Sequence, residues 1–463
     1  MNMKLTRLIT SALCIAAILS SLSGIHAMPA SGQTRGDVRY VKEGGTGDCS
    51  SWENACDLQD ALSDDVSGDE IWVAAGTYYP TDGTDRTISF ILEIGVAVYG
   101  GFVGTETERG QRDWVANPTI LSGDIGSEDD SSDNSYHVVR AIDVDQNTVL
   151  DGFTITAGNA NGEVDANSGG GMFNSNSSPT LANITFSNNL ATIGGGMYNY
   201  HSNPSLAYMI FSGNFAQGTG TSDGGGGMLN EQSNPTLTNV TFSSNETWLR
   251  GGGMYNIQSS PALTNVTFFD NSATTGGGMY NDQSSPTLIN VTFSANWAGV
   301  YGGGIFNTNY SSPFLTNVTF FGNGLTVGGY GGGGMFNQQS SPSLVSVILW
   351  KNTPDQLYSI DSTLDVTYSD IQGAVYPGDG NISGDPKLAP LADNGGFTKT
   401  HALALYFSPA IDNGSPTICP PTDQRGYLRP IDSNGDGNAR CDMGAYEYGS
   451  FFPYYSYLPL IVK

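Results

Sequence analysis

The sequence predicts an all-β protein built as a single parallel β-helix, with an N-terminal cap and a small irregular C-terminal region. Between Gly169 and Asn352 one phrase recurs seven times: Gly-Gly-Gly-Met-aromatic-Asn, a Ser/Asn-Pro turn, and a strand-like stretch that ends at another Asn. A unit this short cannot bury its own apolar face, so it must stack on its neighbours. The Met position recurs at spacings of 25, 31, 26, 25, 26 and 30 residues, at Met172, Met197, Met228, Met254, Met279, Ile305 and Met335.

Each unit is expected to hold three short strands separated by corners. In one copy Leu237, Val240 and Phe242 are apolar, and Asn239 interrupts their alternation. Asn tolerates the left-handed backbone of a sharp corner, so we expect strands on both sides of Asn239 and a third at the Met-aromatic-Asn segment. Successive coils would then pair at about 4.8 Å. A leucine-rich repeat lacks support because the Leu ladder and helical segment are missing, and propeller blades need longer units.

Asn recurs at three positions of the unit, and stacked Asn side chains can satisfy backbone groups that no strand reaches. We favour this structural ladder over glycosylation, because the Asn recurs where the Asn-x-Ser/Thr motif is absent. The first position is Asn174, Asn199, Asn230, Asn256, Asn281, Asn307 and Asn337. The second is Asn189, Asn214, Asn245, Asn271, Asn296, Asn323 and Asn352. The corner position is Asn183, Asn239, Asn265, Asn290 and Asn317, replaced by Tyr208 and Ser346 in two coils.

The rest of the chain divides around this array. Residues 1–27 form a predicted secretion signal, with Lys4 and Arg7 before an apolar run. Residues 28–168 are expected to supply the cap, with a short helix at 57–62, and irregular coils with strands at 71–79, 89–102, 138–144 and 149–156. Residues 353–384 would hold the last coils and a linker, followed by a C-terminal region at 385–449. A hydrophobic tail at 450–463 could act as a sorting segment or as an edge strand.

Charge and cysteine content limit the functions. The formal net charge is −27, and few of the charges lie in the array. So acidic a chain is a poor partner for nucleic acid or anionic membranes, whereas cations and neutral or basic partners fit better. The exported chain would keep Cys49, Cys56, Cys419 and Cys441, which favours two disulfides, most simply within each neighbouring pair.

Several phrases resemble known families. The Gly-Gly-Gly-Met and Phe-x-x-Asn phrases resemble polymorphic outer membrane protein repeats, and with segments such as Leu150-Asp-Gly-Phe-Thr-Ile155 the chain is similar to the pectin-lyase-like superfamily. This resemblance implies a right-handed β-helix and an exported bacterial protein. Segments 408–412, 423–426 and 442–447 resemble a choice-of-anchor Q domain. No C-terminal series of barrel strands accompanies the repeats, which argues against autotransport.

Candidate catalytic residues lie before the array. A polysaccharide lyase needs a base, often Arg or Lys, near acids that bind Ca²⁺. Arg140, Asp143 and Asp145 are the candidates, and alternation would put the two acids on one side of a strand. His137 and Asp151 complete the cluster, but a solvated outer face is the favoured interpretation. Within the array, Arg250 and scattered acids do not suggest a catalytic set.

The stretch 432–438 matches the first half of a Ca²⁺-binding loop, with oxygen-bearing side chains at alternate positions and Gly at the bend. The twelfth position, where a bidentate Glu is expected, is Met443. The alternative is a plain polar hairpin, and a bound Ca²⁺ would be structural. No other cofactor is expected. The candidate ligands are Asp432, Asn434, Asp436, Asn438 and Asp442.

An aromatic residue follows the Met position in six of the seven copies, and Leu229 takes its place in the other. Neighbouring strand residues face opposite ways, so either the Met row or the ring row points outward. An exposed ring row could stack on sugars, although we favour a core or self-stacking role. The candidate ligand-binding residues are Phe173, Tyr198, Tyr255, Tyr280, Phe306 and Phe336.

From these observations we expect an exported, extracellular or surface-associated monomer that binds or adheres to glycans or other surfaces without catalysis. The alternatives are a carbohydrate-active enzyme of the pectate lyase type and a structural spacer without a ligand. Fold alone does not decide among them.

Overall fold

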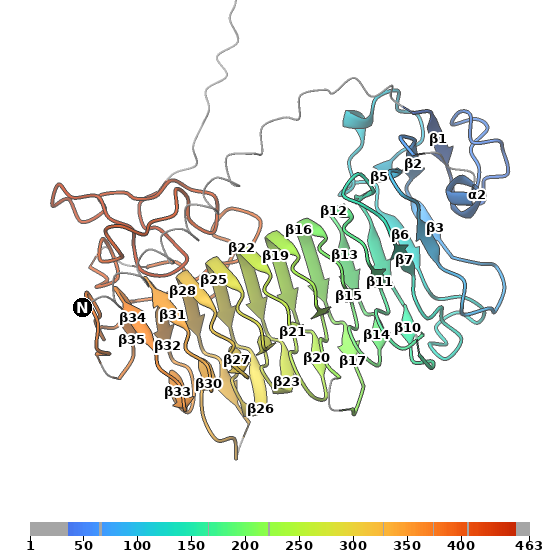
Figure 1. Cartoon of the computed structure of the whole chain (residues 1–463). Coiled ribbons are helices and arrows are strands. Elements are labelled where there is room, and N and C mark those ends of the chain that lie inside the picture. The colour runs from blue at the N-terminus through green and yellow to red at the C-terminus, as the bar shows by residue number, and fades with distance from the viewer. Residues whose placement is uncertain are drawn as a thin grey trace, which may run out of the picture.

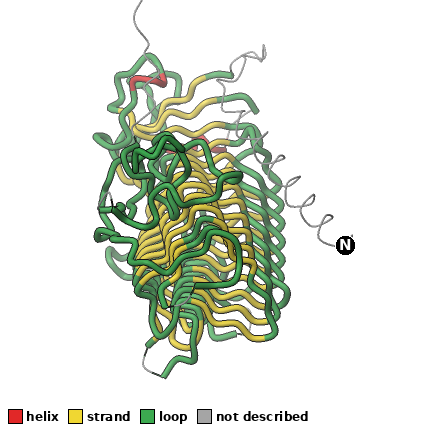
Figure 2. Tube along the Cα trace, turned by 90° about the vertical axis from the view of Figure 1, so that its left-hand side faces the viewer, coloured by secondary structure: helices red, strands yellow, loops and turns green. Residues whose placement is uncertain are grey.

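The computed structural model describes residues 36–63, 67–164, 166–220, 223–326, 328–373, 375–404 and 407–450. These residues form one parallel β-helix, as the repeat predicts (Figure 1). Seen from its end, the chain winds through stacked strands joined by loops at the corners (Figure 2). The predicted secretion signal and residues 451–463 of the tail lie outside the described residues.

Three sheets pair parallel strands of successive coils, and sheets A and B run the length of the helix, whereas sheet C spans residues 159–325. Sheet A has 18 strands: β1 (Val38–Val41), β2 (Glu70–Ala74), β3 (Gly76–Tyr78), β5 (Ala97–Phe102), β6 (Thr119–Ser122), β8 (Val149–Asp151), β9 (Thr154–Thr156), β12 (Thr180–Ala182), β13 (Thr185–Ser187), β16 (Ser205–Ser212), β19 (Thr236–Ser243), β22 (Ala262–Phe269), β25 (Thr287–Ser294), β28 (Phe314–Phe321), β31 (Ser343–Val345), β32 (Ile348–Trp350), β34 (Asp365–Thr367) and β35 (Asp370–Ile371).

Sheet B carries one strand for each of ten coils: β4 (Phe90–Leu92), β7 (Val139–Ile142), β11 (Met172–Ser175), β15 (Met197–Tyr200), β18 (Met228–Glu231), β21 (Met254–Ile257), β24 (Met279–Asp282), β27 (Ile305–Thr308), β30 (Met335–Gln338) and β33 (Leu357–Ile360). Sheet C has seven short strands: β10 (Asn159–Ala160), β14 (Leu190–Ala191), β17 (Phe215–Ala216), β20 (Glu246–Thr247), β23 (Ser272–Thr275), β26 (Trp297–Tyr301) and β29 (Gly324–Leu325).

The corner predicted at Asn239 lies inside sheet A. Asn239 has a φ of 57°, and Tyr208 and Ser346, which replace Asn in two coils, take the same conformation. The strand pieces on both sides of Asn239 belong to β19, so the corner bends one long strand. The repeat therefore needs a residue that accepts a positive φ here, and Asn accepts it at low cost.

The core is a set of identical side chains stacked from coil to coil. Phe186, Phe211, Phe242, Phe268, Phe293 and Phe320 are fully buried, and their rings stack with centroids 4.7–4.9 Å apart. The in-register pairing of the coils places these rings one above the other. The helix is therefore stabilised by burial of apolar area that repeats along its axis.

Two of the Asn rows form buried hydrogen-bonded ladders, as predicted. Asn256 Nδ2 donates to Asn281 Oδ1 at 2.8 Å, and Asn256 Oδ1 accepts from Asn230 Nδ2 at 2.8 Å. In the second row, Asn271 Nδ2 donates to Asn296 Oδ1 at 2.9 Å and to the Phe242 carbonyl at 2.9 Å. Each amide thus satisfies its neighbours without introducing a charge, and those of the second row also satisfy a backbone carbonyl.

The N-terminal end is closed by the predicted short helix, here α2 (Leu58–Ser63), whose apolar residues pack into the core. A 3-10 helix, η2 (Arg109–Gln111), lies in a loop that crosses sheet A. The disulfides Cys49–Cys56 and Cys419–Cys441 form as the neighbouring-pair prediction expects. The irregular coils occur where predicted, although 71–79, 89–102 and 149–156 each divide into two strands.

The C-terminal region packs on the outer face of sheet A, a contact that the sequence did not predict. Thr292 Oγ1 donates to Gln424 Oε1 at 2.7 Å, and Ser294 Oγ lies 2.9 Å from His401 Nε2. Asn317 Nδ2 donates to the Asp442 carbonyl at 2.8 Å. The outward hydroxyl and amide groups of sheet A therefore hold the region in place, over the last coils of the helix (Figure 1).

Candidate ligand-binding face

The outer face of sheet B is the candidate functional face, because Arg140 and the six candidate rings lie in register on it. The structure resolves which side chains point outward. Met254 is fully buried in the main core, whereas Tyr255 belongs to a separate row of rings on the outer side. The outward row runs in register along the sheet as Ile91, Arg140, Phe173, Tyr198, Leu229, Tyr255, Tyr280, Phe306, Phe336 and Tyr358.

The rings in the middle of this row are covered, although they face away from the core. The six candidate rings are between 1% and 8% exposed and pack on one another, with Tyr280 and Phe306 stacked at 4.9 Å. The glycine corner closes over them, since a Cβ on Gly251 would lie 2.8 Å from the Tyr255 Cβ. This packing is the self-stacking arrangement that the sequence favoured. Sugar stacking on the six rings stays a prediction.

At the N-terminal end of the row the cover is lost and Arg140 takes the outward position. Arg140 pairs in register with Ile91 of β4 and with Phe173 of β11. Its guanidinium carbon lies 5.8 Å from the centroid of the Phe173 ring, which is within cation–π range. The Arg140 Nε is buried and has no hydrogen-bond partner among the described residues. Such a group is costly unless a ligand or water completes it.

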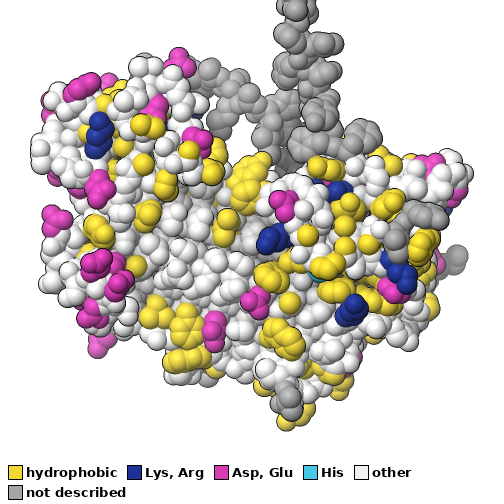
Figure 3. Space-filling view, turned by 180° about the vertical axis from the view of Figure 1, so that it is seen from behind, with side chains coloured by type: hydrophobic (Ala, Val, Ile, Leu, Met, Phe, Trp, Pro, Cys, Tyr) yellow, Lys and Arg dark blue, Asp and Glu magenta, His cyan; other side chains and the backbone are white. Residues whose placement is uncertain are grey.

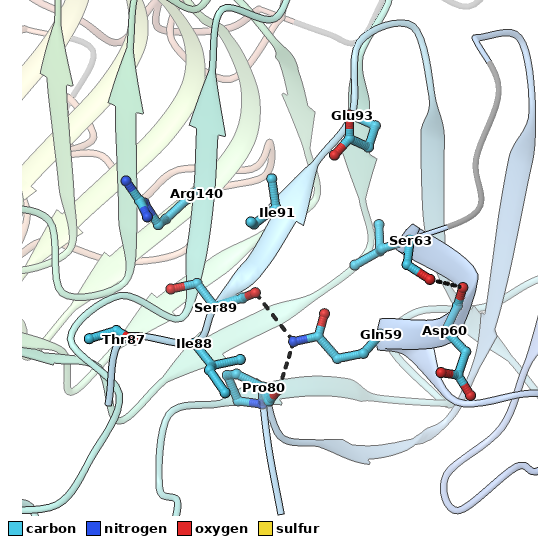
Figure 4. Close-up of a pocket in the computed structure, with 11 residues that line it drawn as sticks. Gln59, Asp60, Ser63, Pro80, Thr87, Ile88, Ser89, Ile91, Glu93 and Arg140 are labelled. Atoms are coloured by element: carbon cyan, nitrogen blue, oxygen red, sulfur yellow. Dashed lines mark hydrogen bonds between the residues drawn. The ribbon is translucent and has the colours of Figure 1, made fainter. Parts of the chain in front are cut away.

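A cavity of about 710 Å³ lies beside Arg140, between sheet B and helix α2. Figure 4 shows Gln59 reaching from α2 toward Pro80 and Ser89. Its Nε2 donates to the Pro80 carbonyl at 2.6 Å and to the Ser89 carbonyl at 3.2 Å, which holds the cap against the sheet. The lining combines one cation, two acids and apolar side chains: Gln59, Asp60, Leu62, Ser63, Pro80, Thr87, Ile88, Ser89, Ile91, Glu93 and Arg140.

The other catalytic candidates do not line this cavity. Strand β7 ends at Ile142, so Asp143 and Asp145 lie in the turn that follows. The expectation that both acids share one side of a strand is therefore wrong, because Asp143 takes a φ of 55° and ends the strand. Asp145 Oδ1 accepts the Asn147 N–H at 2.9 Å, which is a turn contact.

The remaining members of that cluster are engaged elsewhere. His137 is buried, with Nδ1 at 3.1 Å from the Gly169 carbonyl. Asp151 pairs with Arg112 at 2.6 Å on sheet A. Of the cluster, Arg140 alone lines the cavity.

Sequence analysis missed a second group of charges on this face. Tyr198 Oη donates to Glu231 Oε2 at 2.7 Å, and Asn309 Nδ2 donates to Asp282 Oδ1 at 2.7 Å. Glu231 and Asp282 share one outward row, two coils apart, which is about 10 Å. The shared register position, three residues after each Met, was the signal available in the sequence.

The cation of this group is Arg250, whose guanidinium carbon lies 5.6 Å from the Tyr280 ring centroid. Burial raises the pKa of the Tyr255 hydroxyl, and the charge of Arg250 partly offsets that rise. Tyr255 therefore stays neutral at ordinary pH and acts as a packing group.

Ca²⁺ binding by the loop at 432–438 stays a prediction. Asp432 Oδ1 accepts the Gly435 N–H at 2.8 Å, and Asp436 Oδ1 accepts the Asn438 N–H at 2.8 Å. Asp442 is buried, and its two oxygens accept the N–H groups of Asp412 and Tyr448. Within the described ranges no group of three or more His, Cys, Asp or Glu residues is placed to hold a metal ion.

Comparison with known proteins finds a likeness of shape alone. Pectate lyase Pel9A is similar with a TM-score of 0.51 and 13% sequence identity, over 90% of this chain and 98% of that chain. The likeness establishes the fold. A rhamnogalacturonan lyase (TM-score 0.34, 10% identity, 72% of this chain and 87% of that one) and an alginate lyase from Paenibacillus sp. str. FPU-7 (0.24, 12%, 74% and 99%) align less well and carry no argument.

No family model matches the sequence, and no curated protein matches it. The outer membrane protein repeats and the choice-of-anchor region therefore stay predictions. In the described part of the chain, no helix has the length and apolar character needed to cross a membrane.

Proposed function

We propose that this chain is an exported protein that binds a carboxylate-bearing polysaccharide on the outer face of sheet B, in the cavity beside Arg140. The observation that carries the proposal is the buried, unpartnered Nε of Arg140 next to a cavity of about 710 Å³. A guanidinium is suited to a carboxylate, because its planar N–H groups match the two oxygens.

The other lining residues fit the remainder of a sugar. Asp60 and Glu93 are exposed acids that would accept hydrogen bonds from hydroxyl groups. Ile88 and Ile91 offer an apolar surface to the C–H side of a sugar ring. Two disulfides and a predicted secretion signal support a location outside the cell. The pectate lyase that shares the fold is consistent with a uronate ligand, although at 13% identity it supports no more than the fold.

The net charge of −27 opposes a polyanionic ligand at long range. Recognition would therefore depend on Arg140 at short range, and raised ionic strength would speed association by screening the repulsion. This salt dependence is opposite to that of a protein which attracts polyanions through a basic surface.

A second candidate function is a polysaccharide lyase, favoured by the presence of Arg140 and two acids in one cavity. In that case Arg140 would contact the sugar carboxylate or the proton beside it, and the acids would hold a Ca²⁺ ion that neutralises the carboxylate. Binding without turnover is the simpler proposal, because Asp60 and Glu93 come from different elements and the described residues that line the cavity include no third acid.

The test is calorimetric titration of the mature chain with oligogalacturonate, neutral xylo-oligosaccharide and mannuronate oligomers, with and without Ca²⁺. Binding of an acidic oligomer that Arg140→Gln weakens at least tenfold supports the proposal. Arg250→Gln is the matched control on the same face and should leave the affinity unchanged. Formation of an unsaturated product, followed by its ultraviolet absorbance, would show that the protein is a lyase. No binding to any of these glycans would reject both candidate functions.

A further inference from the structure

Sheet C carries exposed aromatic rings that the candidate site does not use. Trp248 is 50% exposed and Trp297 is 42% exposed, and Phe215 is half-buried beside them. We call these three residues the sheet C platform. In Figure 3 hydrophobic side chains gather along the lower edge of the molecule, where Figure 1 places the strands of sheet C. Phe215 and Trp248 are in ring contact, and contiguous exposed apolar patches mark interaction surfaces in soluble proteins.

The register of sheet C puts the rings in a line parallel to the helix axis. Phe215 is equivalent to Glu246, Ser272 and Trp297 in the next three coils. Phe215 and Trp297 are thus about 14 Å apart, at about 4.8 Å for each coil. Trp248 lies one coil from Phe215, directly after β20, and its ring meets the Phe215 ring edge-on at 5.5 Å.

A glycine makes room for the Trp297 indole on the surface. Gly324 is the register partner of Trp297 in the next coil. A Cβ on Gly324 would lie 2.6 Å from the indole Cζ3, and the three nearest atoms to it all belong to Trp297. The indole therefore lies over the backbone of the next coil, and part of it remains open to solvent.

The surroundings of the rings are almost uncharged. The strands of sheet C contain one charged residue, Glu246, among small and hydroxyl-bearing residues such as Ser272 and Thr274. An anionic polymer would gain nothing there and would meet the negative field of the protein. A membrane surface fits poorly, because the sheet has no Lys or Arg to pair with anionic lipid.

We propose that the sheet C platform binds a neutral, extended polysaccharide chain that lies parallel to the helix axis, with sugar rings stacked on Trp248 and Trp297. The apolar C–H face of a sugar packs on an aromatic ring, and the hydroxyl groups at its rim can pair with Ser and Thr side chains. The two exposed indoles lie two coils apart along the helix, an arrangement that suits a polymer. A protein hot spot clusters its anchors in a closed pocket. The inference goes beyond the acidic ligand of the Arg140 cavity and uses a different face.

The test is retention of the mature chain on microcrystalline cellulose, with mobility in a native gel containing hydroxyethyl cellulose as the second readout. The double variant Trp248→Ala/Trp297→Ala should lose at least tenfold in retention. Gly324→Ala keeps both tryptophans and should lose several-fold, because its Cβ displaces the indole. Tyr310→Ala, an exposed ring away from sheet C, and Arg140→Gln should retain wild-type binding.

Circular dichroism of each variant checks that the fold is intact. Equal retention of the wild type and the double variant would overturn the inference. A second result would also overturn it: the wild type binds neither glucan but dimerises as its concentration rises, and the double variant does not dimerise. The platform would then be a protein interface. Loss of oligogalacturonate binding in Arg140→Gln with unchanged cellulose retention would separate the two sites.

Discussion

In the repeat array the polar side chains that are buried are Asn, Ser and Thr, whereas the C-terminal region buries carboxylates and guanidinium groups. In the array, Asn256 bonds to the same amide in the coils on both sides. In the C-terminal region, Arg429 pairs with Glu447 at 2.9 Å and Arg425 with Asp423 at 2.6 Å, all of them buried. Repetition lets neutral amides satisfy one another, and an irregular chain without a ladder uses charges to fix its loops.

The difference extends to pH dependence. Burial raises the pKa of Asp442 and of Glu447, while the Arg429 guanidinium partly offsets both shifts. Burial also lowers the pKa of His401, at the contact with sheet A, to about 4. The buried groups of the array are neutral amides and hydroxyls, and burial raises the pKa of the Tyr255 and Tyr280 hydroxyls further from neutral pH. We therefore expect acid and base to loosen the C-terminal region before they affect the repeat array.

The largest expected effect comes from removing a buried ion pair of the C-terminal region. Arg429→Met should destabilise the C-terminal region by about 3–5 kcal/mol, because it leaves the buried carboxylate of Glu447 without its partner. Hydrogen exchange should show rapid exchange in 407–450 and unchanged protection in 236–321. Lys387→Met, which breaks an exposed pair with Asp385, is the control and should change stability by less than about 1 kcal/mol. Equal loss of protection in both segments would show that the region and the helix unfold together.

Asp370, in the last coil, tests how the stability of the protein depends on pH. It is fully buried, and its two oxygens have no hydrogen-bond partner in the described structure. Burial raises its pKa to about 7. Between about pH 4 and 7 the folded state holds a proton that the unfolded state has lost, so stability falls as pH rises through that window.

Asp370→Asn should therefore stabilise the protein by about 2–4 kcal/mol above pH 7 and leave it unchanged near pH 4. Denaturant unfolding at a series of pH values measures this. His401 contributes the opposite slope, because its folded pKa lies below the unfolded value and stability is lost as pH falls from about 6.5 to 4. The same Asp370→Asn effect at pH 4 and pH 8 would contradict the account.

Asn271→Ala tests the uncharged amide ladder of the array. This change removes the oxygen that accepts hydrogen bonds from the backbone N–H and the side-chain amide of Asn245, and the amide that donates to the Phe242 carbonyl. We expect a loss of about 3 kcal/mol in the free energy of unfolding, constant between pH 5 and 8 because no ionised group is involved. Asn203→Ala removes one exposed amide and should cost less than about 1 kcal/mol. A pH-dependent loss for Asn271→Ala would mean that the array also depends on charge.

Much of this comparison could be predicted from the sequence. The period, the left-handed corner at Asn239, the two amide ladders and both disulfides follow from repeated residues or cysteine spacing. The direction of the Met-aromatic strand could not be predicted, because alternation gives opposite faces without saying which is inside. The structure shows that outward is not the same as exposed, since glycine corners close over Tyr255.

The candidate site was predicted in part. Arg140 was named from the sequence, but the cavity is formed by Gln59 and Pro80 of the cap, which no local pattern joins to it. Asp143 and Asp145 were misplaced because the strand was drawn two residues too long. The docking of the C-terminal region depends on single contacts such as Gln424 with Thr292, which have no period to reveal them.

Recognition of the acidic glycan is assigned to the irregular coils before Gly169, at the cavity beside Arg140. The most direct measurement is the affinity of oligogalacturonate for the wild type, Arg140→Gln and Arg250→Gln, titrated side by side. We expect at least a tenfold loss for Arg140→Gln, which is about 1.4 kcal/mol, and no change for Arg250→Gln. A loss confined to Arg250→Gln would contradict the assignment, because the acidic glycan would then bind within the array.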